Sequence, residues 1–225
     1  MFWKIRLVLE AIYDQALFTI GQYSHGLPQL LLDRLGLKLP SRDHILLLVL
    51  AKNLKGTAVE VGVFQGYFSA KILTHTLVSK LYSIDPWLEF ASQEYVDRAN
   101  QAQVIQEERY QLTCDRLRPF LERSEIIRAT SEQEVASFQD LSLDFVYIDA
   151  NHSYEQCLLD LQMWWPKVKL GGIIAGDDYT DSDNGVTRYG VKRATNQFFN
   201  NQAQRLVITY KSGKIHWPNW YVVKK

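Results

Sequence analysis

The feature that most constrains the fold of this chain is a pair of short apolar segments that both end in acidic residues. Residues 143–148 form one largely apolar run, and Asp149 follows it directly. Residues 172–175 form a second run, and Asp177 and Asp178 follow it closely. Strands buried on both faces of a parallel sheet read as hydrophobic runs, and ligands bind beyond the carboxyl ends of such strands. The two acidic ends are therefore predicted to lie at a functional site.

The same pattern continues through most of the chain, because short apolar runs alternate with helical segments from residue 57 onward. Such alternation favours parallel strands joined by right-handed helical crossovers, in an α/β fold with helices on both faces of the sheet. The predicted parallel strands are residues 58–61, 80–84, 125–129, 143–148 and 172–175. The tail is different, because residues 205–210 and 214–223 are predicted to form a hairpin that adds an antiparallel finish to the sheet.

Residues 1–54 are predicted to form an N-terminal helical cap, and residues 55–225 the α/β domain. Apolar residues recur at helical spacing between residues 5 and 20, while charged residues such as Lys4 and Glu10 interrupt any long apolar run. No transmembrane segment is therefore expected. The apolar stripe is predicted to pack on the core or on a second copy of the chain, as a homo-oligomer formed through the N-terminal helices. A helix that lies on a membrane surface is the alternative.

Composition narrows the class of partner. The 25 Lys and Arg residues balance the 25 Asp and Glu residues, so no net field recruits a nucleic acid, and none is expected as a partner. A small molecule is the better expectation. Cys114 and Cys157 lie far apart in the sequence and lack a metal-binding or disulfide-rich spacing, which suits the reducing cytoplasm.

A glycine-bearing turn between Glu60 and Ser69 follows the first predicted strand and opens a helix. Glycines at Gly62 and Gly66 let the backbone turn tightly beside a ligand. A dinucleotide-binding turn has a further glycine that lets a pyrophosphate approach, but Phe64 stands in that place. The turn therefore favours a nucleoside cofactor without phosphates, and a nicotinamide oxidoreductase is a less favoured alternative. Asp85 ends the next strand, where a carboxylate can accept the hydroxyl protons of a ribose.

The end of the third strand offers a border for an adenine ring at Ala129, Thr130 and Ser131. The other interpretation is that Thr130 or Ser131 caps a helix over residues 132–138. Together with the turn and the acidic strand ends, this gives one set of candidate cofactor-binding residues: Glu60, Gly62, Gly66, Tyr67, Ser69, Asp85, Thr130, Ser131 and Asp149.

With these motifs the chain resembles the class I S-adenosylmethionine-dependent methyltransferases. The resemblance rests on residues 60–66, 83–87, 144–155 and 171–179, and it covers roughly residues 55 to 225. It implies a Rossmann-like, seven-stranded, mostly parallel sheet with an antiparallel last strand, and S-adenosylmethionine as the cofactor. Within the family, the chain is most similar to the metal-dependent O-methyltransferases of the catechol and macrocin type.

Three acids are candidate metal ligands. Asp149, Asp177 and Asp178 are predicted to meet at adjacent strand ends, where like charges a few ångströms apart cost on the order of 4 kcal/mol per pair. A divalent cation would relieve this repulsion, and oxygen-only ligands favour Mg²⁺. The catechol-type pattern ends in an Asp-Asn pair, whereas this chain has two acids, as the macrocin type does. The alternative interpretation is that Asp149 belongs to the cofactor pocket and the other two acids cap a loop.

His152 is nominated as the general base by the same resemblance, because it lies three positions after Asp149. Ser153 is predicted to start a helix there, and a helix N-terminus disfavours the imidazolium, although the neighbouring acids favour it. The alternative is a histidine that is simply bonded to a carboxylate.

The sequence thus predicts a cytoplasmic S-adenosylmethionine-dependent O-methyltransferase that acts on a hydroxyl of a small metabolite, assisted by a divalent cation and by His152 with Asp149. Two alternatives remain. One is a metal-independent methyltransferase in which His152 acts alone, and the other is a noncatalytic cofactor-binding or assembly module.

Overall fold

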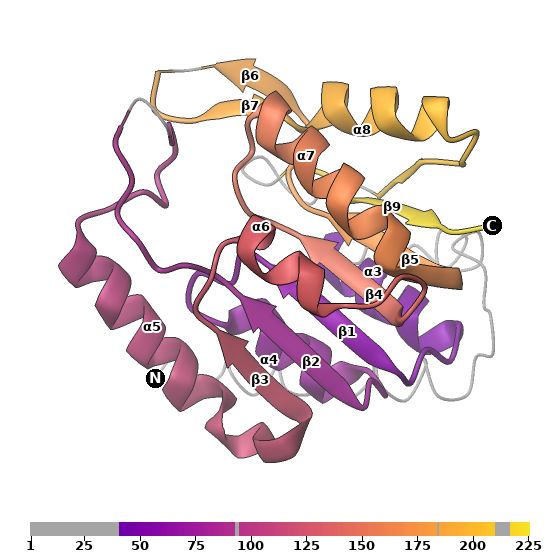
Figure 1. Ribbon diagram of the computed structural model, residues 1–225, viewed down its shortest axis with the longest axis horizontal. Coiled ribbons are helices and arrows are strands. Elements are labelled where there is room, and N and C mark those ends of the chain that lie inside the picture. Colours follow the sequence, from indigo (N-terminus) through magenta and orange to yellow (C-terminus); the bar gives the residue numbers. More distant parts are fainter. Residues whose placement is uncertain (1–40, 93–94, 184, 210–216) are drawn as a thin grey trace, which may run out of the picture.

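The computed structural model describes residues 41–92, 95–183, 185–209 and 217–225 of the chain (Figure 1). The predicted N-terminal stripe and most of the predicted cap lie outside these residues, as does the expected turn of the terminal hairpin. The first described helix, α3 (Ser41–Ala51), belongs to the segment that was predicted as the cap. The boundary between cap and domain stays a prediction.

A seven-stranded sheet forms the centre of the molecule, with the strand order β3-β2-β1-β4-β5-β9-β8 (Figure 1). Strands β1 to β5 are parallel to one another, whereas β9 is antiparallel to both β5 and β8. This confirms the predicted Rossmann-like, mostly parallel sheet with an antiparallel last strand. The bounds are β1 (Thr57–Val61), β2 (Lys80–Ile84), β3 (Ser124–Ile127), β4 (Leu143–Ile148), β5 (Val168–Gly176), β8 (Val207–Ile208) and β9 (Trp220–Val223).

Helices cover both faces of the sheet, as the strand-helix alternation predicted. One face packs against α3 and α4 (Tyr67–His75), with Leu117 at the end of α5 (Gln103–Leu117). The other face packs against α7 (Tyr154–Trp164) and α8 (Val191–Asn201). The short helix α6 (Ser131–Glu134) follows β3, and 3-10 turns occupy Arg118–Arg123, Val135–Ser137 and Trp165–Lys167.

The hydrophobic runs are explained by burial on both sides of the sheet. In β4, Phe145 and Tyr147 belong to the core on the α3 and α4 side, whereas Val146 and Ile148 belong to the core on the α7 and α8 side. All four side chains are buried. Burying each large apolar side chain stabilises the fold by about 1.5–3 kcal/mol, so this central strand cannot tolerate the polar alternation of a half-exposed sheet.

A short hairpin lies beyond β5. Strand β6 (Asp181–Asp183) pairs with β7 (Arg188–Gly190) in a separate two-stranded sheet. The backbone N–H of Gly190 donates to the carbonyl of His152 at 2.8 Å. The hairpin is thereby attached to the edge of the main sheet at which β4 and β5 end (Figure 1).

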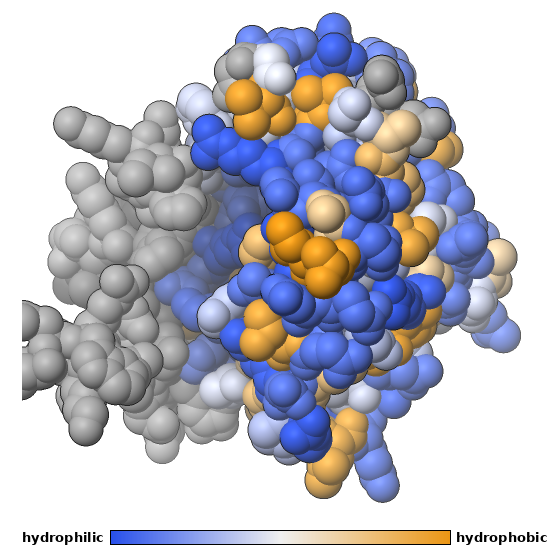
Figure 2. Space-filling model, turned by 90° about the vertical axis from the view of Figure 1, so that its left-hand side faces the viewer, coloured by the Kyte–Doolittle hydropathy of each residue, from blue (hydrophilic) through white to orange (hydrophobic). Residues whose placement is uncertain are grey.

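The described surface has a polar character on the face that Figure 2 presents. Apolar residues stand there in small separate groups among hydrophilic ones (Figure 2). Scattered exposed apolar residues of this kind are normal for a folded protein and need no partner. In the part of the chain that the structure describes, no helix is both long and apolar enough to cross a membrane.

Candidate active site

Gly62 brings the ends of β1 and β4 together. Its φ is +86°, and a Cβ atom at this position would lie 2.0 Å from the carbonyl oxygen of Asp149. Any other residue would clash with that backbone and would also adopt the left-handed conformation that glycine tolerates best. The first glycine of the turn is therefore required by the close approach of two strand ends.

Phe64 takes a left-handed conformation in the same turn, with φ of 58°. The strain is offset by contacts on both sides of the residue. The indole Nε1 of Trp87 donates to the Phe64 carbonyl at 2.9 Å, and the guanidinium carbon of Arg109 lies 4.3 Å from the centre of the phenyl ring. The residue that interrupts the dinucleotide pattern is thus part of the structure of the turn.

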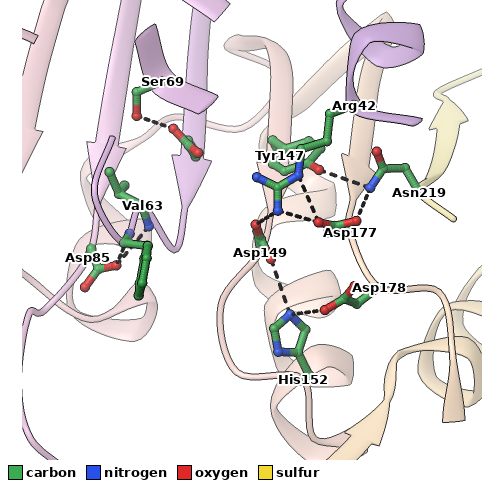
Figure 3. A network of polar contacts seen from close by, with 12 residues as sticks. Arg42, Val63, Ser69, Asp85, Tyr147, Asp149, His152, Asp177, Asp178 and Asn219 are labelled. Atoms are coloured by element: carbon green, nitrogen blue, oxygen red, sulfur yellow. Dashed lines mark hydrogen bonds and ion pairs between the residues drawn. The ribbon is translucent and has the colours of Figure 1, made fainter. Parts of the chain in front are cut away.

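Asp85 ties the turn to the end of β2. Its Oδ2 accepts the backbone N–H groups of Val63 at 2.8 Å and Phe64 at 3.0 Å (Figure 3). Its Oδ1 accepts that of Trp87 at 2.8 Å. Burial raises the pKa of Asp85, and these three hydrogen bonds oppose the rise. Each carboxylate oxygen has more than one lone pair, so the carboxylate can still accept hydroxyl protons of a ligand.

Two cavities open at the carboxyl edge of the sheet. The larger, of about 320 Å³, extends from Gly62 and Asp85 to the loop at residues 129–132. The smaller, of about 220 Å³, is lined by Arg42, Tyr67 and other residues of α3, α4 and the turn. Both cavities are lined by Gly62 and by Asp149, so they adjoin.

The predicted cofactor-binding residues are distributed unevenly between these cavities. The larger one is lined by Gly62, Asp85, Thr130, Ser131 and Asp149. The smaller one is lined by Glu60, Gly62, Tyr67 and Asp149. Neither lining includes Gly66 or Ser69. Gly66 instead precedes α4 in a left-handed conformation, and Ser69 points to Glu60 behind the turn (Figure 3).

Glu60 is a buried acid beneath the turn, with 1% of its surface exposed. Its Oε2 accepts the hydroxyl proton of Ser69, whose Oγ in turn accepts the hydroxyl of Ser83 at 3.0 Å. Burial raises the pKa of Glu60 to about 8, although the Ser69 hydrogen bond opposes the rise. Ser69 therefore acts on Glu60 and not on the cavity.

The stability of the protein should depend on the ionisation of Glu60. An acid whose pKa is raised by folding stabilises the folded state fully below its unfolded pKa, and this contribution disappears as pH rises through the folded value. The free energy of unfolding should therefore fall between about pH 4.5 and pH 8, by about 1.4 kcal/mol for each unit of pKa difference. Urea unfolding should show a smaller loss over this range for Glu60→Gln. Glu155→Gln, at an exposed position of α7, is the control, and a Glu60→Gln curve parallel to that of the wild type would contradict the assignment.

Thr130 and Ser131 combine the two roles that the sequence left open. Thr130 caps α6 in a capping box with Gln133, and Thr130 and Ser131 also line the larger cavity. The hydroxyl of Ser131 donates to Asp160 Oδ1 at 2.6 Å and accepts from Trp164 Nε1 at 2.8 Å. The loop after β3 is therefore fixed to α7 by a buried polar chain.

The structure brings Asp149, Asp177 and Asp178 together, around two cationic side chains (Figure 3). Arg42 Nη2 donates to Asp149 Oδ2 at 2.6 Å and also to Asp177 Oδ2, which accepts Arg42 Nε at 2.9 Å. His152 Nε2 lies 3.3 Å from Asp149 Oδ1 and 3.5 Å from Asp178 Oδ2. The repulsion expected among these acids is thus already relieved by side chains of the same protein.

The charged side chains of this acidic cluster shift one another's pKa values. Burial alone would raise the pKa of Asp149, but Arg42 and His152 outweigh it and lower that pKa. Burial and the charge of Asp149 raise the pKa of Asp177 against the opposing effect of Arg42. Burial would lower the pKa of Arg42, yet the neighbouring acids raise it, so this side chain stays charged.

The acids do not fit a divalent cation in this arrangement. Within the described ranges, no group of three His, Cys, Asp or Glu side chains is placed to hold a metal ion. Asp177 Oδ1 accepts a hydrogen bond from the side-chain amide of Asn219. Oδ2 of Asp149 and Oδ2 of Asp177 both accept hydrogen bonds from Arg42. The metal set predicted from the sequence stays a prediction that this geometry does not support.

His152 is held between carboxylates on both ring nitrogens. Its Nδ1 lies 3.1 Å from Asp97 Oδ2, on the side opposite Asp149. Burial would lower its pKa, but the hydrogen bonds to Asp149 and Asp97 raise it to about 10. Ser153 caps the following helix as predicted, accepting from the Gln156 N–H at 3.3 Å. The acids outweigh the helix N-terminus, so His152 carries a proton at neutral pH in this state.

Sequence reasoning missed the partners that hold several of the predicted site residues. Arg42, Asp97, Asn219 and Asp160 lie far along the chain from the side chains they contact and belong to no recognisable motif. Only the fold brings them to the carboxyl edge, and the positive charge of Arg42 beside three acids could not be read from local spacing.

Comparison with known families identifies the class of protein. Residues 59–179 match the family described as Methyltransferase domain, which is more than half of the chain. The chain therefore belongs to this family. Its fold and motifs are those of a class I S-adenosylmethionine-dependent methyltransferase. No curated protein matches the sequence.

Solved structures share the fold at low sequence identity. A protein from Corynebacterium glutamicum has a TM-score of 0.59 at 14% identity, covering 99% of this chain and 96% of that one. The O-methyltransferase from Bacillus cereus in complex with SAH has a TM-score of 0.56 at 15% identity, with 80% and 79% covered. The N-methyltransferase NodS from Bradyrhizobium japonicum has a TM-score of 0.56 at 14% identity, with 80% and 91% covered. These likenesses support the fold.

Proposed function

We propose that this methyltransferase transfers a methyl group from S-adenosylmethionine to a hydroxyl of a small metabolite. The observation that carries the proposal is the pair of adjoining cavities, which share Gly62 and Asp149 and end at the acidic cluster. A nucleoside in the larger cavity would lie beside Asp85 and the loop at residues 129–132. The amino-acid tail of the cofactor would then extend toward Glu60 and the smaller cavity.

When bound, S-adenosylmethionine supplies a methyl carbon that accepts an electron pair from the acceptor oxygen as the carbon–sulfur bond breaks and its electrons stay on sulfur. Alignment of the two partners accounts for much of the rate in such a displacement. Asp149, at the wall common to both cavities, is the residue best placed to orient the acceptor.

The acceptor hydroxyl must also lose its proton, and the acidic cluster is the group of side chains that can take it. Because His152 already carries a proton between Asp97 and Asp149, it cannot accept another, and we assign the proton to the carboxylate of Asp178, whose pKa burial raises to about 7. The positive charge of His152, whose ring nitrogens face Asp97 and Asp149, then stabilises the negative charge that develops on the oxygen, which is an electrostatic contribution to catalysis. An amine acceptor reacts in its neutral form, so it has less need of a cluster of carboxylates than a hydroxyl acceptor has.

An acceptor screen tests the proposal. The full chain is incubated with S-adenosylmethionine and with matched pairs of small molecules that carry either a hydroxyl or an amine on the same skeleton. Formation of S-adenosylhomocysteine together with a methyl ether is the expected result. A methylamine formed in preference to the ether would overturn the O-methyl assignment, and S-adenosylmethionine binding without turnover of any acceptor would favour the noncatalytic module.

A further inference from the structure

Arg42 reaches from outside the matched family region into the acidic cluster. The residue lies in α3, before β1, while its partners Asp149 and Asp177 follow β4 and β5. Helix α3 is anchored by Ile45 and Val49, which are fully buried in the core on this side of the sheet. The guanidinium is therefore delivered by a packed helix and not by a free surface side chain.

The guanidinium is fixed by its surroundings on more than one side. Its carbon lies 5.4 Å from the centre of the Phe68 ring and 6.0 Å from that of Tyr147. Tyr147 and Asp177 are in turn bridged by the side-chain amide of Asn219 (Figure 3). The planar guanidinium suits this position, because its N–H groups form a rigid fork that can bind two carboxylates at once.

We propose that Arg42 is the resident cation of the active site and takes the place that a divalent metal ion would occupy between Asp149 and Asp177. The site then works without a metal. The catalytic role of Arg42 rests on the proposed methyl transfer. The binding of Arg42 to the two acids does not, because it can be measured without cofactor or acceptor.

The proposal follows from competition for the same oxygens. A metal ion could bind Asp149 Oδ2 and Asp177 Oδ2 only by displacing Arg42, whose charge-assisted hydrogen bonds to the carboxylates are stronger than neutral ones. The displaced guanidinium would have to leave a half-buried position beside two rings. Because Arg42 is bonded to Asp149, which lines both cavities, it is placed to stabilise negative charge on an acceptor oxygen that Asp149 orients.

Titration with Mn²⁺, followed by electron paramagnetic resonance, tests this proposal. The proteins compared are the wild type, Arg42→Ala, Arg42→Lys and the control Arg118→Ala. The control removes an exposed arginine of the 3-10 turn after α5. Wild type and Arg118→Ala should bind no Mn²⁺ at the cluster. Arg42→Ala should gain one Mn²⁺ site, which a second change, Asp177→Asn, removes. A wild-type site that is lost in Asp177→Asn alone would overturn the proposal, and so would an Arg42→Ala variant that folds but binds no Mn²⁺.

Activity with an acceptor from the screen adds a second readout. A chelator should leave the wild-type rate within about twofold, while Arg42→Ala should lose on the order of 100-fold in kcat. Arg42→Lys keeps the positive charge but loses the planar fork of N–H groups. Its kcat should therefore lie between those of the wild type and Arg42→Ala, and it provides a folded variant if alanine destabilises the protein. Loss of wild-type activity in the chelator and its return with Mg²⁺ would contradict the proposal. A chain that binds no S-adenosylmethionine would refute the proposed function and leave the Mn²⁺ result standing.

Discussion

Replacing Gly62 with alanine is expected to abolish cofactor binding and to lower the free energy of unfolding by about 4 kcal/mol or more. The reason is the combination of a φ of +86° with a Cβ position 2.0 Å from the Asp149 carbonyl oxygen. The end of β1 would have to move away from β4, and this movement would open the wall that the two cavities share. Urea unfolding and calorimetry with S-adenosylmethionine measure the two effects.

Gly171 provides a matched control for this change. It has a φ of +78°, and a Cβ atom there would meet nothing within 4 Å. Gly171→Ala should therefore cost only the strain of the left-handed conformation, about 1–2 kcal/mol, and leave cofactor affinity unchanged. Equal losses of stability in Gly62→Ala and Gly171→Ala would show that the close contact with Asp149 is not the cause.

Replacing Asp85 with alanine should lower the affinity for S-adenosylmethionine by more than about 100-fold. The carboxylate accepts three backbone N–H groups, from Val63, Phe64 and Trp87, and it also lines the larger cavity. Its loss would leave those donors unpaired, at about 1–3 kcal/mol for each one that stays buried, and would remove the proposed acceptor for the ribose hydroxyls. Calorimetry measures the affinity, and circular dichroism checks that the variant remains folded.

The exposed acid Asp115 gives the comparison for Asp85, because its side chain is 64% exposed and pairs with Arg118 at the surface. Asp115→Ala should bind S-adenosylmethionine as the wild type does. If Asp85→Ala kept wild-type affinity while remaining folded, the ribose would have to be held elsewhere and the proposed orientation of the cofactor would be wrong.

The sheet could be predicted from the sequence because burial on both faces leaves a direct trace in the chain. The run over residues 143–148 coincides with β4, and residues 80–84 coincide with β2. The ends of strands were harder to place: β3 ends at Ile127 and not at residue 129, since Thr130 already caps the next helix. At that point a helix-capping residue and a strand residue would both be polar and have an extended backbone, so the local sequence pattern alone does not distinguish them.

The active site was predictable only in part. The acids at the ends of β4 and β5 could be placed because parallel strands end at one edge of the sheet. Their partners could not, because Arg42 is separated by 107 residues from Asp149 and by 135 from Asp177. A repulsive cluster of acids indicates that some cation is present, but it does not say whether the cation is a metal ion or a side chain from another part of the fold.

The crystal structure of the chain with S-adenosylhomocysteine tests the central claim most directly. We predict that the ribose hydroxyls lie at hydrogen-bonding distance from Asp85, about 2.5–3.0 Å. The adenine ring should lie against the loop at residues 129–132, and the sulfur should face Asp149. A nucleoside bound away from the carboxyl edge of the sheet, or turned so that its adenine occupies the smaller cavity beside Arg42, would contradict it.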